Sequence, residues 1–332
     1  MRKTEYEEAS MSAFDNAAGR RRLALSRREL LAGGAAVAAL AALPLGLRPA
    51  FAAEPHRIAL GDMELTVVSD GNLVLRPAKF IAPEADEAEF QALMAAYDLP
   101  LDEVKPACNV ALLRSGGRLV LFDAGSGPRF MESAGRLVDS LGAAGVDPSE
   151  VTDVVFTHGH PDHLWGVLDD FDEEVFSEAS YHVARPEWDF WMAEDVLSKL
   201  PEIAHSFAAG AQRNYQAIED RVTFFEAGQE ILPGVEAVES FGHTPGHVSF
   251  ELRSGNDALF LTGDAITHRA VSFERPDWAS SSDHDRDMGA RTRARLLDRL
   301  ATEKTALLGF HLPYPGIGHA ERKDRAYRFV PA

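Results

Sequence analysis

Short apolar runs rich in β-branched residues alternate with segments of helical spacing from His56 onward. In the first half, this pattern predicts strands in "MELTVVSDG", in both runs of "NVALLRSGGRLVLFDAG", which are joined at Gly116-Gly117, and in "VTDVVFT". The segment "FMESAGRLVDSLGAAG" has helical spacing and ends at Gly145, a residue type that commonly stops a helix.

The second half continues the alternation. Residues 184–218 are predicted to be mostly helix and loop. Four further strand candidates follow, "VTFFEAG", "VEAVESFG", "VSFELRSG" and "DALFLTGD", then a helix from about Met288 to Ala301 and a last strand in "TALLGF". Strands and helices in mixed succession, with hairpins in each half, predict a layered α/β domain with helices outside and sheets inside.

The first 52 residues have a different pattern. An arginine-rich stretch leads into an apolar segment, Leu30 to Leu47, and then into the small-residue site Ala50-Phe51-Ala52. The segment "SRRELL" resembles the twin-arginine export signal. We therefore expect an export signal in residues 1–52, a single catalytic domain in residues 53–332, and a periplasmic or secreted protein. A retained membrane anchor is the alternative, because the apolar segment is about long enough to span a bilayer.

Composition and net charge limit the kinds of molecule that the protein can bind. The 332 residues are 45% apolar, which is enough for a substantial core. The whole chain carries a net charge of −19, and residues 1–52 hold eight Lys/Arg and five Asp/Glu (+3), which leaves −22 for the rest. Such a surface repels nucleic acid and anionic lipid. The single cysteine, Cys108, excludes an internal disulfide and a multi-cysteine zinc site, and we interpret it as a small buried apolar residue.

The segment "THGHPDHLWG" concentrates metal-type donors directly after a predicted strand. His158, His160, Asp162 and His163 fall within six positions. Imidazole and carboxylate are typical ligands of zinc-type divalent ions. Pro161 suits the first turn of a helix, so two of the histidines are expected on the loop and the other two donors on the helix. Four donors this crowded indicate two adjacent metals rather than one.

Further donors are expected at the ends of other apolar strands, because such loops display site residues on a rigid scaffold. Three places fit this plan. "VESFGHTPGHVSF" offers His243 and His247, "LFLTGD" ends in Asp264, and "LLGFH" ends in His311.

Together these elements resemble the signature of the metallo-β-lactamase-fold hydrolases, in the order of that family, over about residues 56–330. Within the superfamily the chain is most similar to the methyl parathion hydrolase group, on "ALGDMELTVVSDG", "DAGSG" and "GFHLPYPGIGHAERKDRAYRFVP". The resemblance implies a four-layer αββα sandwich of two similar halves. It also implies two divalent metal ions, with zinc as the default and manganese, iron or cobalt as alternatives.

The resemblance also assigns roles to individual residues. One metal would be held by His158, His160 and His243, the second by Asp162, His163 and His311, and Asp264 would bridge them. It makes His247 a supporting residue, and Asp123 a residue that holds the metal-bearing loops through hydrogen bonds.

The implied reaction is hydrolysis of a neutral, small-molecule ester-like substrate, an aryl phosphotriester or a lactone, by a metal-bridging hydroxide. Asp162 and Asp264 would be the catalytic carboxylates, with Asp162 orienting the hydroxide or relaying a proton. The bridging carboxylate argues against β-lactam hydrolysis, and His160 argues against the diiron flavoproteins. Thr267 stands where acyl-homoserine lactonases often carry tyrosine, which argues against that oxyanion arrangement but not against lactone hydrolysis.

Alternatives on the same fold are a thioesterase, a sulfatase, a persulfide dioxygenase, or an inactive metal-binding module, and a homodimer stays open. For His268 and His284 we expect exposed or structural positions, with approach to the site as the alternative. "SSDHDRDM" indicates an Asp-capped helix start, with a metal role as the alternative. Pocket and core roles are equally open for a set of aromatic residues: Phe80, Trp165, Trp188, Phe190, Trp191 and Phe273.

Overall fold

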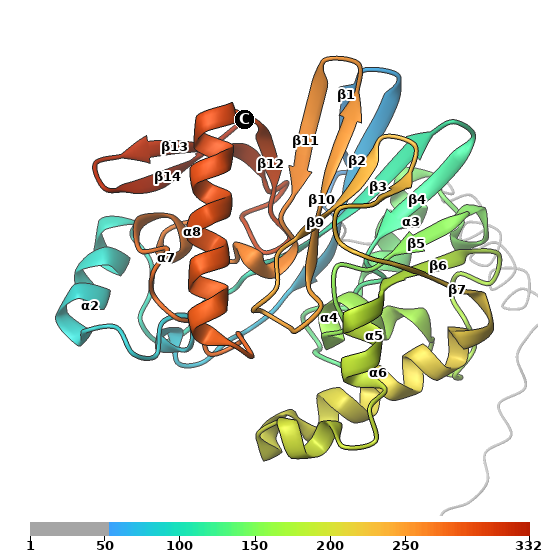
Figure 1. The fold of residues 1–332 in the computed structure, drawn as a ribbon, viewed down its shortest axis with the longest axis horizontal. Coiled ribbons are helices and arrows are strands. Elements are labelled where there is room, and N and C mark those ends of the chain that lie inside the picture. Colours follow the sequence, from blue (N-terminus) through green and yellow to red (C-terminus); the bar gives the residue numbers. More distant parts are fainter. Residues whose placement is uncertain (1–52) are drawn as a thin grey trace, which may run out of the picture. The chain divides into compact units, whose positions relative to one another are not determined.

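The computed structural model describes residues 53–332, which are coloured in Figure 1. The predicted export signal, residues 1–52, lies outside the described residues. Among the residues that are described, no helix combines the length and apolar character needed to cross a membrane.

Two seven-stranded sheets form the centre of the domain, and in each sheet the strands follow one another in chain order (Figure 1). The first sheet contains β1 (His56–Leu60), β2 (Met63–Asn72), β3 (Ala107–Ser115), β4 (Arg118–Phe122), β5 (Asp153–Val155), β6 (Ser180–Ala184) and β7 (Val222–Phe225). The second contains β8 (Glu230–Leu232), β9 (Val235–Glu239), β10 (Val248–Ser254), β11 (Asp257–Leu261), β12 (Ala306–Leu308), β13 (Ile317–Lys323) and β14 (Ala326–Pro331). Strands β4 to β7 are parallel, as are β11 and β12, and the other neighbours are antiparallel.

Helices cover the outer face of each sheet. The α-helices are α2 (Glu87–Ala96), α3 (Leu137–Ala144), α4 (Pro161–Leu164), α5 (Arg185–Trp191), α6 (His205–Ile218), α7 (Val271–Glu274) and α8 (Arg286–Glu303). Apolar side chains of α3 to α6 pack on the first sheet, and those of α8 pack on the second. The predicted four-layer αββα sandwich is therefore confirmed.

Burial on both faces explains why the central strands read as continuous apolar runs. In β3, Val110 and Leu112 pack toward the helices, while Ala111 and Leu113 point into the core between the two sheets. Successive side chains of a strand alternate between faces, so a strand covered on both sides needs an apolar residue at every position.

Several element boundaries differ from the predictions. The helix predicted across residues 130–145 is only α3, which ends at Gly145 in the left-handed conformation (φ 81°). The helix predicted from Met288 to Ala301 extends by two residues at each end. Strands β13 and β14 were not predicted as strands, because they end the sheet and expose many charged side chains.

A buried carboxylate ties together the strands that lead to the histidine-rich segment. Asp153, at the start of β5, accepts hydrogen bonds from Arg118 of β4 at 2.8 and 2.9 Å, and its Oδ1 lies 2.9 Å from Nε2 of His182 of β6. Burial opposes ionisation of Asp153, but the hydrogen bonds from His182, Thr152 and Arg118 outweigh it and lower the pKa to about 2.

We expect Asp153→Asn to lower the free energy of unfolding by about 2 kcal/mol at pH 7. This is somewhat less than the free energy that corresponds to the full pKa shift, because Arg118 is half exposed and solvent screens its charge. The folded-state pKa is depressed, so this contribution is present above the ordinary pKa of 3.8 and is lost as the pH falls toward 2. Urea unfolding at pH 7 and pH 3, with chelator in all samples, measures it. An equal difference between variant and wild type at both pH values would contradict the prediction.

Candidate metal centre

The seven predicted ligand residues come together, all of them buried, at the ends of β5, β9, β11 and β12. His158 and His160 lie on the loop after β5. Helix α4 begins at Pro161, as predicted, and its first turn carries Asp162 and His163. The others come from the second half of the chain: His243 follows β9, Asp264 lies in a short 3-10 turn after β11, and His311 follows β12.

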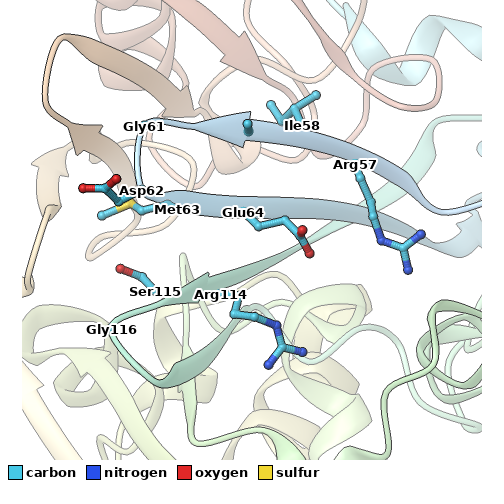
Figure 2. Close-up of a pocket in the computed structure, with 10 residues that line it drawn as sticks. Arg57, Ile58, Gly61, Asp62, Met63, Glu64, Arg114, Ser115 and Gly116 are labelled. Carbon is cyan, nitrogen blue, oxygen red and sulfur yellow. The ribbon is translucent and has the colours of Figure 1, made fainter.

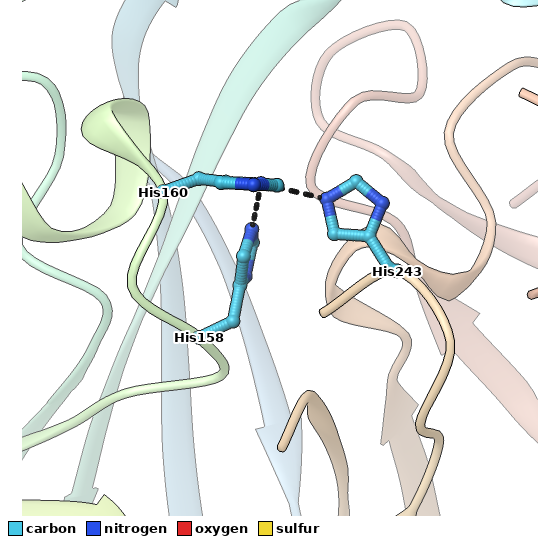
Figure 3. A group of neighbouring side chains, drawn as sticks. All are labelled: His158, His160 and His243. Carbon is cyan, nitrogen blue, oxygen red and sulfur yellow. Dashed lines mark hydrogen bonds between the residues drawn. The ribbon is translucent and has the colours of Figure 1, made fainter. Parts of the chain in front are cut away.

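Three histidines form one group, the histidine triad: His158, His160 and His243. Figure 3 shows the first two rings on one loop, facing the third across the site. The Nδ1 atom of His160 lies 2.9 Å from Nε2 of His158 and 2.9 Å from Nε2 of His243. Three ring nitrogens therefore converge on one point, which is the arrangement of a three-histidine metal site.

A second group, the carboxylate group, consists of Asp162, His163 and His311. Asp264 lies between the two groups. Its Oδ2 is 3.3 Å from Nε2 of His243 and 3.2 Å from Nε2 of His311, and its Oδ1 is 3.3 Å from Nε2 of His163. Asp162 Oδ2 lies 3.2 Å from His311 Nε2 and 3.5 Å from His163 Nε2, so Asp162 contacts both histidines of the group.

Unpaired atoms test whether these residues suit metals. Asp162 Oδ2, His163 Nε2 and Asp264 Oδ1 are buried and form no hydrogen bond within the protein. Nearly all buried polar atoms in proteins have a partner, so atoms facing one another without one indicate a cation site. Nitrogen and carboxylate donors in this number suit zinc-type ions.

Electrostatics divides the histidines into two classes. Burial, followed by the neighbouring imidazoles, lowers the pKa of His158 and His160 well below the usual value, which leaves both rings neutral. Burial also opposes the charged forms of His163 and His311, but the charge of Asp264 outweighs it and raises the pKa of both. Burial likewise opposes the charged form of His243, but Asp264 and Asp283 outweigh it and raise the pKa to about 9. The carboxylates thus attract positive charge to the three histidines that face them.

Asp123 fixes the loop that carries the first ligands. It accepts a hydrogen bond from the backbone N–H of Thr157 at 2.7 Å, and its Oδ2 lies 2.8 Å from Nδ1 of His163. An outer carboxylate of this kind sets the tautomer and orientation of a ligand histidine. The predicted role of Asp123 in hydrogen bonding is confirmed.

His247 supports the site without joining either group. Its Nε2 accepts the backbone N–H of Asp264 at 2.9 Å, and its Nδ1 lies 2.8 Å from Oγ of Ser240. Both ring nitrogens are therefore engaged, in agreement with the supporting role expected from the sequence.

Asp283 contacts the histidine triad, a position that the sequence did not predict. Its Oδ1 lies 3.0 Å from Nδ1 of His243, and its Oδ2 accepts a hydrogen bond from buried Arg293 at 2.9 Å. The helix start predicted in "SSDHDRDM" is confirmed, with Asp285 as the N-cap of α8. The contact of this carboxylate with the triad could not be read from the sequence, because His243 lies 40 residues away along the chain.

A cavity of about 580 Å³ opens onto both groups. Residues His160, Asp162, His243, Asp264 and His311 line its floor. Its walls are mainly apolar, with Leu73, Leu75, Phe80, Ile81, Phe130, Met131, Leu200, Ile203, Ala204 and Phe207, and they also include the polar residues Lys199, Ser280, Ser281, Ser282 and Arg286. The cavity therefore suits a small molecule with an apolar part.

Only Phe80 of the candidate aromatic residues lines this cavity. Trp165 lies behind the wall, packed against Phe130 and Phe207, which were missed. The remaining candidates belong to the apolar core or pack against it: Trp188, Phe190, Trp191 and Phe273.

The two histidines left open have different positions. His268 is buried and caps α7, because its Nδ1 accepts the backbone N–H of Val271 at 3.0 Å. His284 instead lines the cavity, and its Nε2 lies 3.3 Å from Nε2 of His160. His284 therefore lies at the site, which the expected structural role did not include.

A second hollow, of about 410 Å³, lies beside the β1–β2 hairpin (Figure 2). Arg57, Glu64 and Arg114 are among the residues that line it, and none of the seven ligand residues is. It therefore offers no counterpart to the metal-type groups.

Burial also places the one cysteine beside the carboxylate group. Cys108 is fully buried in β3, and its sulfur lies within 4.8 Å of ligand atoms of Asp162 and His311. Burial raises the pKa of this thiol to about 12, which favours the neutral form. The apolar interpretation is therefore compatible with its burial but missed its position beside the site.

Comparison with known proteins agrees with this geometry. The family model for the metallo-beta-lactamase superfamily matches residues 105–309. The solved structure of AidC, a dizinc quorum-quenching lactonase, is 29% identical, with a TM-score of 0.80 over 85% of this chain and 98% of that one. The hydrolase AbOPH is 27% identical, with a TM-score of 0.78 over 84% and 98%.

Two curated relatives match a smaller share of this chain than the two solved structures do. The probable metallo-hydrolase YqjP of Bacillus subtilis is 30% identical over 179 residues, 49% of this chain and 54% of the relative, so the chain spans about half of its length. An N-acyl homoserine lactonase of Bacillus thuringiensis is 23% identical over 60% of this chain and 68% of the relative. Because the family model spans most of the chain, including the histidine triad and Asp264, the protein belongs to the metallo-β-lactamase superfamily and is a metal-dependent hydrolase.

Proposed function

We propose that the protein is a dinuclear hydrolase that opens lactones or closely related neutral esters carrying an apolar tail. The observation that carries this proposal is the position of Asp264, between the histidine triad and the carboxylate group at the floor of an apolar cavity. The likeness to a dizinc lactonase supports both zinc and the lactone class.

We assign the seven donors to two ions. The histidine triad would hold the first, the carboxylate group would hold the second, and Asp264 would contribute to both. Two such cations, when bound, lower the pKa of water and polarise a carbonyl oxygen.

The protein residues would orient the reactants. Asp162 lines the cavity, and its Oδ2 forms no hydrogen bond with the protein. It is therefore placed to take a proton from the attacking water and to return it to the leaving oxygen. Thr267 also lines the cavity and offers no phenol, so this position supplies no tyrosine to the substrate carbonyl.

The walls would select the tail. Apolar side chains surround the space above the donors, and neutral esters lose little solvation when they enter such a space. Aryl phosphotriesters are the second candidate class, because the rings of Phe80, Phe130 and Phe207 all border the cavity. The arginine-rich leader supports action in the periplasm or outside the cell.

A substrate panel tests the reaction. Protein reconstituted with zinc, manganese or cobalt should hydrolyse acyl lactones, and kcat/KM should rise with the length of the acyl tail. Loss of an outer hydrogen-bond partner of a metal ligand lowers activity by roughly 10- to 100-fold, and Asp264→Ala should lower kcat/KM by more than that. The panel also contains aryl phosphotriesters, aryl esters, thioesters, sulfate esters and, with an oxygen electrode, persulfides. A fully metal-loaded protein that hydrolyses none of them would favour a metal-binding module instead.

Metal content tests the ligand assignment. His243→Ala should lose about one of two metal equivalents, since it removes a nitrogen of the histidine triad. His247→Ala should keep both, because its ring nitrogens are engaged by Asp264 and Ser240. Elemental analysis after dialysis measures the stoichiometry, and the reverse pattern would overturn the choice between the two histidines.

Phe207→Ala tests the tail site. The ring borders the cavity, and removing most of an aromatic side chain from an apolar contact costs about 1.5–3 kcal/mol. We therefore expect kcat/KM for a long-tailed lactone to fall by about tenfold or more, with a short-tailed lactone nearly unaffected. Equal losses for both substrates would place Phe207 outside the tail site.

A further inference from the structure

A buried carboxylate on α5 receives hydrogen bonds from both halves of the domain. Glu187 is 1% exposed. Its Oε1 accepts the backbone N–H of Gly159 at 2.8 Å and the indole N–H of Trp191 at 2.6 Å. Its Oε2 accepts the hydroxyl of Thr244 at 2.6 Å and the backbone N–H of Gly246 at 3.0 Å. We call these five residues the Glu187 clasp.

The clasp joins the two loops that carry the histidine triad. Gly159 lies between His158 and His160, and Thr244 directly follows His243. One oxygen of Glu187 therefore holds the loop from the first half, and the other holds the loop from the second half.

Close packing against α5 explains the two glycines of these loops. A Cβ atom at Gly159 would overlap the indole nitrogen of Trp191, and one at Gly246 would overlap the backbone of Glu187. Neither glycine has a positive φ, so backbone conformation does not require them. The loops need glycine here because the helix approaches their backbones.

The chemistry of the four partners requires an acceptor at both oxygens. All four are N–H or O–H donors, so an ionised carboxylate satisfies them and an amide satisfies only half. Burial raises the pKa of Glu187, and the hydrogen bonds from Thr244 and Trp191 oppose that effect. Trp191 adds a direct contact, since its ring centroid lies 5.8 Å from that of His160.

We propose that Glu187 is a positioning residue that holds the two triad loops at the spacing required for metal binding. This inference rests on the metal assignment of the proposed function. It concerns the triad specifically, because the carboxylate group has other supports: Asp123 contacts His163, and Ala107 O lies 2.7 Å from Nδ1 of His311.

A general structural role would give a different result from a positioning role. Loss of fold stability alone would weaken both metals together. Loss of triad geometry would weaken the triad metal and leave the metal of the carboxylate group nearly unchanged.

The test uses Glu187→Gln in the full-length protein, with Glu251→Gln as the matched control. Glu251 is likewise a buried glutamate, 2% exposed, but it lies in β10 and pairs with Arg253 and Arg299. Apo protein is titrated with Co²⁺ and, in competition with a chelator, with Zn²⁺. The Co²⁺ absorption spectrum follows the coordination of each equivalent.

We expect Glu187→Gln to weaken one equivalent by about 10- to 100-fold and to change its Co²⁺ spectrum, with the other equivalent within about twofold of wild type. Glu251→Gln should bind both as wild type does. If Glu187→Gln fails to fold, Thr244→Val and Trp191→Phe each remove one donor and should show the same selective weakening at a smaller size.

The outcomes separate this inference from the proposed function. Wild-type protein that binds two metals, with a Glu187→Gln variant that binds both equally well or loses both equally, overturns the positioning role alone. Wild-type protein that binds no metal overturns the dinuclear function, and the positioning role with it. Folded Thr244→Val and Trp191→Phe variants with unchanged affinities at both sites also contradict the clasp.

Discussion

The structure depends on keeping buried side chains, whose lone pairs face one another, together at one place without water. Five imidazoles and two carboxylates are buried at one place, and three of their atoms have no hydrogen-bond partner. Neighbouring ligand atoms that each present a lone pair cannot form hydrogen bonds with one another, so they need a shared positive charge between them. The fold therefore has to hold the groups together until a cation binds, and the outer hydrogen bonds of Asp123, Asp283 and Glu187 serve that purpose.

The architecture divides this task unequally between the halves. The first half supplies four donors from a single loop and helix start, which β5 delivers from the middle of a parallel set of strands. The second half supplies three donors from three separate strand ends. Asp264 contacts members of both groups, so its carboxylate is where the two contributions meet.

Sequence patterns predicted the parts whose signals are local. The "THGHPDHLWG" segment places its donors within six positions, and the later donors each follow an apolar strand, so both could be recognised directly. Glu187 and Asp283 could not, because an isolated acidic residue at a helix start usually faces solvent, and only tertiary packing buries these two. Strands β13 and β14 were missed for a related reason: their exposed charges hide the alternation.

Separation of the ligands along the chain has a consequence for how the protein acquires metal. The first ligand is His158 and the last is His311, so the carboxylate group is not complete until β12 has paired with β11 in the second sheet. Contacts between such distant residues form late in folding, because closing a long loop costs conformational entropy that is offset only once the contact has formed. Metal binding at the carboxylate group is therefore coupled to the end of folding, and a chain interrupted before β12 would contain the histidine triad and Asp264 but lack His311.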